Sequence, residues 1–184
     1  MGYQGKITVP RYPKIKPTTM RILVIKNFFL TPAQFPPEMI PSLQDWFMQQ
    51  KLHGKESRCR TRFVKLLAPR IEEIESERQA MIKKWAKKND KGEMLFLDKD
   101  GKETTTNTNR IVFTDEAKLN DEYRAYMAED FVIDVTPANS EVIFGARDIL
   151  LNTTDEFTGV AASRYEEICE AFESIGETKV KNKK

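Results

Sequence analysis

The stretch PRIEEIESERQAMIKKWAKKN, residues 69–89, decides the fold, because it predicts one long amphipathic helix. Its apolar side chains recur at the spacing that places residues on one side of a helix: Ile71, Ile74, Met81 and Trp85. Glutamates lie near the start of the stretch and lysines near its end, which is the arrangement that the helix macrodipole favours. The proline that opens the stretch fits the first turn of a helix, so we expect the helix to begin there.

Two helices are expected before this one. Ser42 and Asp45 resemble a capping box, which predicts a helix that starts after Ser42 and stops at Gly54. Ser57 is then expected to cap a second helix that runs to about Ala68.

After the long helix, residues 89–106 predict a β-hairpin with its turn at Asp98–Gly101, and residues 110–113 are expected to add a short strand. A further helix is expected to open at Thr114. It is expected to lie antiparallel to the long helix that begins at Pro69, so that the β-hairpin forms the tip of this helix pair. Residues 131–135 either end this helix or form a strand. Two more helices are expected, at 141–151 and at about 160–175.

The N-terminal part of the sequence predicts extended structure instead of helices. Residues 8–18 are basic and interrupted by prolines, which predicts an extended arm, and residues 19–30 predict a strand rich in β-branched side chains. We therefore expect an α+β, mostly helical fold with about five helices, a helical hairpin with a small β tip, and an N-terminal strand. The expected divisions are a basic, proline-rich arm and strand (1–41), a mainly helical domain (42–176) and a flexible basic tail (177–184).

Charge is distributed unevenly along the chain. Of the 184 residues 40% are hydrophobic and 32% are charged, and the net charge is +2. Residues 1–70 contain 13 Lys/Arg and 3 Asp/Glu, whereas residues 71–184 contain 17 and 25, so the halves carry +10 and −8. Such a split indicates either contact with an acidic partner or mutual neutralisation of the two halves. No apolar run is long enough to span a bilayer, so we expect no membrane partner.

The sequence contains no recognisable catalytic motif. His53 is the only histidine, and neither a nucleophile elbow nor a glycine-rich phosphate loop occurs. The loop DKDGKE, residues 98–103, lacks the later ligands of a calcium loop. Cys59 and Cys169 lie far apart in the sequence and predict free thiols in a reducing, cytoplasmic setting. We expect a protein that is not an enzyme and that holds no metal and no cofactor.

A second stretch, HGKESRCRTRFVKLL at residues 53–67, concentrates basic side chains. On a helix, Cys59, Phe63 and the leucine pair after them fall within a sector of about 100°, which predicts the core-facing side. The cations form a stripe beside that sector. With the basic residues of the N-terminal arm they make the candidate partner-binding set: Arg11, Lys14, Lys16, Lys55, Arg58, Arg62 and Lys65.

Three interpretations of the basic stripe stay open. The cations can bind an acidic protein partner, contact the phosphates of a nucleic acid, or face solvent and the chain's own acidic half. The sequence pI of about 8.4 is moderate, no aromatic side chain interleaves with the stripe, and no helix-turn-helix spacing is evident. These observations favour a protein partner over nucleic acid.

Four pieces of the chain resemble an uncharacterised family of small phage and prophage proteins of Gram-positive bacteria. They are GKESRCRTRF (54–63), DKGE (90–93), EDFVID (129–134) and YEEICEAFE (165–173). The resemblance implies a phage gene product made in the host bacterial cytoplasm, and it implies no reaction.

Together with the basic stripe, this context predicts a non-enzymatic protein that binds a host or virion protein. The alternatives are a nucleic-acid-binding accessory protein and a structural virion subunit of the head or tail. The sequence leaves the oligomeric state open.

Overall fold

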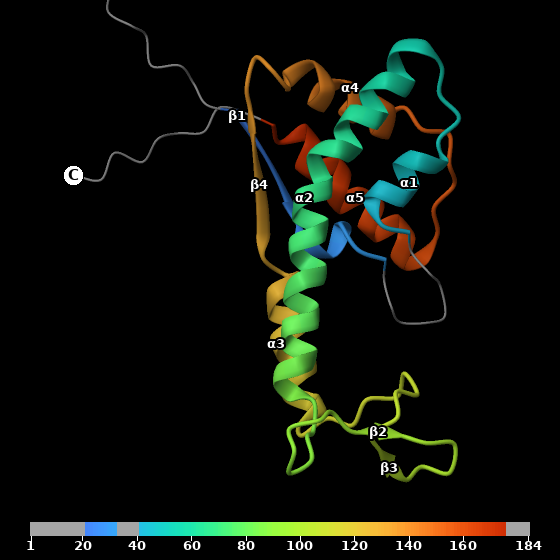
Figure 1. The fold of residues 1–184 in the computed structure, drawn as a ribbon. Helices are drawn as coiled ribbons and strands as arrows, with labels where there is room; N and C mark the ends of the chain where they lie inside the picture. Colours follow the sequence, from blue (N-terminus) through green and yellow to red (C-terminus); the bar gives the residue numbers. More distant parts are fainter. Residues whose placement is uncertain (1–20, 33–40, 176–184) are drawn as a thin grey trace, which may run out of the picture.

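The computed structural model describes residues 21–32 and 41–175. Its fold is α+β and mostly helical, as expected (Figure 1). In chain order the elements are β1 (Arg21–Lys26), a 3₁₀ turn η1 (Asn27–Phe29), α1 (Leu43–Gln49), α2 (Gly54–Trp85), β2 (Phe96–Leu97), β3 (Glu103–Thr104), α3 (Glu116–Met127), β4 (Asp130–Val135), α4 (Ser140–Leu151) and α5 (Gly159–Glu173).

Helix α2 corrects the expectation of two helices meeting at Pro69. It is one helix of 32 residues with Pro69 inside it. A proline within a helix removes the bond to the carbonyl four residues earlier, here that of Lys65, at a cost of roughly 3 kcal/mol. Lys65 and Pro69 are both exposed, so water can reach the Lys65 carbonyl. Buried Leu67 and Ile74 hold the helix to the core on either side of the proline.

The start of α2 also differs from the prediction. Gly54 does not end the preceding helix, since α1 already ends at Gln49. Gly54 is instead the first residue of α2, at φ +53°, and His53 rather than Ser57 is the N-cap residue. The expected cap of α1 is confirmed, because the Ser42 hydroxyl accepts a hydrogen bond from the Asp45 amide at 3.1 Å.

One part of the molecule, called the body below, holds the main core. It comprises β1, β4, α1, α4, α5 and residues 54–70 of α2 (Figure 1). β1 pairs antiparallel with β4, which settles residues 131–135 as a strand, and Leu23 and Ile25 point from it into the core. Phe63 lies at the centre, with ring centroids 5.1 Å from Phe47 and 5.7 Å from Phe172. The N-terminal strand is therefore built into the same core as the helices.

The other part, called the extension below, comprises residues 71–127 and projects from the body (Figure 1). The second half of α2 and α3 form the expected helical hairpin, and β2 pairs with β3 at its tip. The expected strand at 110–113 is present only as isolated bridges, in which Phe113 pairs with Ala86 and Ile111 with Phe96. The Trp85 indole donates to the Glu122 carboxylate at 2.7 Å and ties the two helices together.

A polar joint connects the body with the extension. Asn27 is completely buried, and its side chain donates to the Tyr126 carbonyl at 2.8 Å and accepts from Arg70 Nε at 3.0 Å. The Arg70 guanidinium lies over the rings of Tyr126 and Phe131 and pairs with Glu73 at 2.8 Å. Three segments distant in the sequence are thereby fixed at one point.

Candidate protein-binding surface

The structure places four of the seven predicted binding residues on one side of α2. Lys55, Arg58, Arg62 and Lys65 are all exposed, and their spacing of three and four residues keeps them in one stripe. The other three, Arg11, Lys14 and Lys16, lie outside the described residues. The core-facing side is as predicted, since Cys59, Phe63 and Leu67 are buried.

One cation of the stripe is neutralised within the molecule. Lys55 pairs with Glu141, the second residue of α4, with 2.9 Å between Nζ and Oε1. The hydrogen bond from Lys55 holds the pKa of Glu141 below its usual value, and the charges of Arg62 and Arg58 act in the same direction. Pairing with the chain's own acidic half is thus confirmed for Lys55.

The remaining three cations are unpaired in the parts of the chain that the structure describes. Arg58, Arg62 and Lys65 form neither an ion pair nor a side-chain hydrogen bond with any residue in 21–32 or 41–175. Over the same ranges several acidic residues are already matched with other cations, for example Glu73 with Arg70 and Glu122 with Lys84. The stripe therefore presents positive charge to solvent.

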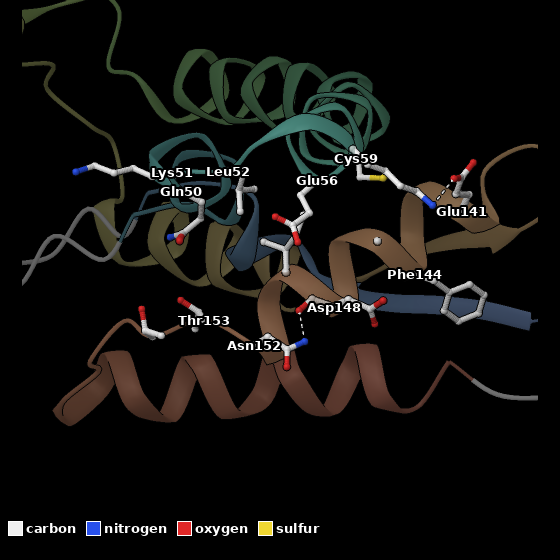
Figure 2. A pocket seen from close by; sticks show the side chains of 14 residues that line it. Gln50, Lys51, Leu52, Glu56, Cys59, Glu141, Phe144, Asp148, Asn152 and Thr153 are labelled. Atoms are coloured by element: carbon white, nitrogen blue, oxygen red, sulfur yellow. Dashed lines mark hydrogen bonds and ion pairs between the residues drawn. The ribbon is translucent and has the colours of Figure 1, made fainter.

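Beside the stripe the surface is hollowed in two places. A hollow of about 390 Å³ is lined by Lys55, Arg58, Cys59, Arg62, Glu141 and Val142. It meets a larger groove of about 650 Å³ between α2 and α4, whose floor includes Leu52, Cys59 and Ile149. Figure 2 shows Glu56 extending from α2 and Asp148 from α4 among the side chains that line this groove. The Lys55–Glu141 pair lies where the two hollows join.

Gly145 sets how closely the two helices approach. A Cβ atom at this position would lie 2.8 Å from the Cys59 sulfur, which is shorter than van der Waals contact. The neighbouring Ala146 is fully buried, so two adjacent small residues lie where α4 packs on α2. The groove borders this close crossing.

Arg60 has a positioning role that the sequence did not indicate. It carries a charge like its neighbours, yet its guanidinium donates to the Gln50 carbonyl at 2.7 Å and to the Ser57 hydroxyl at 3.2 Å. It thereby holds the segment between α1 and α2 against the helix. Helical periodicity places Arg60 away from the stripe, but it cannot predict the hydrogen bond of Arg60 to the Gln50 carbonyl.

Glu141 and Gly145 are the other surface residues that the sequence did not indicate. Both belong to α4, which is distant in the sequence from the stripe that it packs beside. No local pattern connects the two helices. Only the tertiary packing of α4 on α2 brings an acidic residue to Lys55.

Within 21–32 and 41–175 no group of three or more His, Cys, Asp or Glu side chains could hold a metal ion. Cys59 and Cys169 are free and buried, and burial raises the pKa of the Cys169 thiol, which disfavours the reactive thiolate. Burial also raises the pKa of Tyr165 to about 12.

Comparison of the chain with protein-family models, with curated proteins and with solved structures finds no match. Among the described residues, no helix has the length and apolarity needed to cross a membrane.

Proposed function

We propose that this chain is a non-enzymatic protein-binding module that holds an acidic segment of a partner along the first half of α2. The observation that carries the proposal is the stripe of Arg58, Arg62 and Lys65, which is exposed and unpaired among the described residues. From the first to the last of these residues the helix rises about 10 Å. A partner segment with acidic side chains at similar intervals would face all three cations.

Charge alone does not give a stable complex, because an exposed ion pair contributes only about 0.2–1 kcal/mol. The groove beside the stripe supplies an apolar floor at Leu52, Cys59 and Ile149 that a partner side chain could cover. In this arrangement the cations steer and orient the partner, while burial in the groove adds affinity.

The nature of the partner rests on the resemblance to phage and prophage proteins. It supports a bacteriophage protein made in the host cytoplasm, with a host enzyme or a virion component as the acidic partner. The same three cations also fit phosphates, so a nucleic-acid-binding accessory protein is the second candidate. A structural virion subunit is the third, and it would assemble with other particle proteins.

The test is affinity capture from host lysate with and without nuclease, using wild type, a stripe variant and a control. The stripe variant carries Arg58→Glu, Arg62→Glu and Lys65→Glu. The control reverses three exposed lysines of the extension that have no ion pair among the described residues, Lys88→Glu, Lys91→Glu and Lys99→Glu. Both variants should melt close to wild type, because exposed side chains contribute little to stability.

The expected result is one protein retained after nuclease by wild type and by the control, and lost by the stripe variant. Loss of all capture on nuclease treatment would assign the stripe to nucleic acid. Equal capture by the stripe variant and by wild type would show that the stripe does not bind the partner.

A further inference from the structure

Among the described residues, no strand pairs with the outer edge of β4. β1 pairs with β4 on one side and also packs against α5, whereas β4 makes its extensive contacts with β1 alone among the described elements. An edge strand presents a row of main-chain donors and acceptors to which another strand can add. The outer edge of β4 is therefore a candidate docking site on the opposite side of the sheet from β1.

The pairing register identifies the main-chain groups that face outward. The Asn27 amide donates to the Glu129 carbonyl at 3.1 Å, which makes these two residues a hydrogen-bonded pair. Hydrogen-bonded and non-bonded pairs alternate along an antiparallel ladder, so Asp130, Val132 and Asp134 direct their N–H and C=O groups away from β1. One of these groups, the Asp134 carbonyl, accepts from the Asn139 side chain at 2.9 Å, which confirms the outward direction.

The side chains of the same three residues form an exposed acidic row with an apolar centre. Val132 is 50% exposed, and Asp130 and Asp134 flank it on the same face. Asp130 pairs with Lys26, and Asp134 has no ion pair within the described residues. An added strand would place its own side chains directly opposite this row.

The charges argue against a second copy of this chain as the occupant. If two β4 edges paired antiparallel about Val132, Asp130 of each copy would face Asp134 of the other. Like charges directly opposite each other destabilise a strand pair. A strand with lysine or arginine at two positions four residues apart, and apolar side chains between them, would instead match both aspartates and cover Val132.

We infer that the outer edge of β4 is a docking site for an extended basic segment of a protein partner, which adds to the sheet as a third strand. Main-chain bonds to the outward groups of β4 provide the attachment, and Asp130 and Asp134 select the basic sequence. This surface is separate from the basic stripe of α2 and has the opposite charge. Strand binding at β4 and partner binding at the stripe can therefore be tested independently.

The test measures fluorescence anisotropy of labelled synthetic strands titrated with the full chain. The probe has seven residues, with lysine at its second and sixth positions and valine at the three between them. A matched strand carries glutamate in place of both lysines. A third strand keeps the lysines but has N-methyl groups on the alternate amides that would face β4.

The expected result is that wild type binds the lysine strand at least about fivefold more tightly than the glutamate strand. Asp134→Lys should reverse this preference, which a purely structural loss cannot do. Asp134→Asn should weaken it, because Asp130 remains. The N-methylated strand should not bind, and this arm leaves the protein unchanged.

Three outcomes would overturn the inference. The first is equal binding of both charged strands to wild type and to Asp134→Lys, and the second is undiminished binding of the N-methylated strand. The third is binding that appears only when the chain's own C-terminal lysines are reversed (Lys179→Glu, Lys181→Glu and Lys183→Glu), since that segment would then be the occupant.

Discussion

The body and the extension share α2 but are stabilised in different ways. In the body, aromatic rings and the aliphatic side chains of all six elements form one continuous core around Phe63. The buried residues of this core reach the extension only as far as Ile74 and Met127, and half-buried Tyr123 packs against them. Farther out, small separate contacts around Met81 and Phe96 replace it.

Polar pairs supplement these contacts in the extension. Lys84 and Trp85 both bind Glu122, and Lys87 pairs with Glu103. Exposed pairs of this kind are individually weak, whereas buried apolar area is the dominant favourable contribution to folding. One continuous helix therefore passes from a part with a large apolar core to a part with few buried contacts. We expect local unfolding of the second half of α2 to require less free energy than unfolding of the first half.

The largest expected effect follows from emptying the centre of the body. Phe63→Ala removes a fully buried ring that contacts two others, so the free energy of unfolding should fall by about 3–5 kcal/mol. Chemical denaturation followed by circular dichroism measures this loss, and the whole chain should unfold at the lower midpoint. An unchanged midpoint would contradict the assignment of Phe63 to the core centre.

The same type of change in the extension should have a smaller and local effect. Phe96→Ala removes a buried ring at the tip, where nearby solvent-exposed segments can partly fill the space, so we expect a loss of about 2 kcal/mol. Hydrogen exchange read by mass spectrometry should accelerate in residues 71–127 and stay unchanged in β1 and α5. Faster exchange throughout the body would show that the two parts unfold as one unit.

The close crossing of α2 and α4 offers a finer test within the body. Gly145→Ala places a methyl group 2.8 Å from the Cys59 sulfur and should cost about 1–3 kcal/mol, although alanine is the better helix former. Combined with Cys59→Ala, which removes the sulfur, the same change should cost clearly less. A double-mutant cycle of denaturation midpoints measures this coupling, and additive effects would contradict the contact.

The smallest expected effect concerns acidification of the extension. Hydrogen bonds from Lys84 and Trp85 hold the pKa of Glu122 below its usual value of 4.5. Their stabilising contribution is therefore complete above pH 4.5 and is lost as the pH falls through the lower pKa of the folded state. Tryptophan fluorescence of Trp85 should report this loss in a Trp46→Phe background, and Glu122→Gln should flatten the profile at this step.

The extension could be predicted closely from the sequence because local signals determine it. The apolar stripe of α2, the turn at Asp98–Gly101 and the acidic start of α3 each act within a few residues, and all are confirmed by the structure. Asp115 accepts from the Lys118 amide at 3.0 Å as the N-cap residue, so α3 starts at Glu116, two residues later than expected.

The errors lie where distant packing outweighs a local preference. Gly54 and Pro69 both signal helix boundaries in the sequence. In the structure, however, α2 begins at Gly54 and continues through Pro69. The body packs against α2 on both sides of the proline, and this burial offsets the missing bond. For the candidate surface, periodicity placed the four α2 cations correctly. It could not supply Glu141 or the groove, which come from α4.

Pro69 also bears on how the molecule transmits motion. At 1.5 Å per residue, α2 is about 48 Å long, so it acts as a strut that keeps the stripe and the β2–β3 tip at a fixed separation. A strut bends most readily where a backbone bond is missing, and that position is next to Arg70. The bonds of Arg70 to Asn27 and Glu73 brace this position. With this position braced, a load applied at the tip would be carried along α2 into the body instead of bending the helix at Pro69.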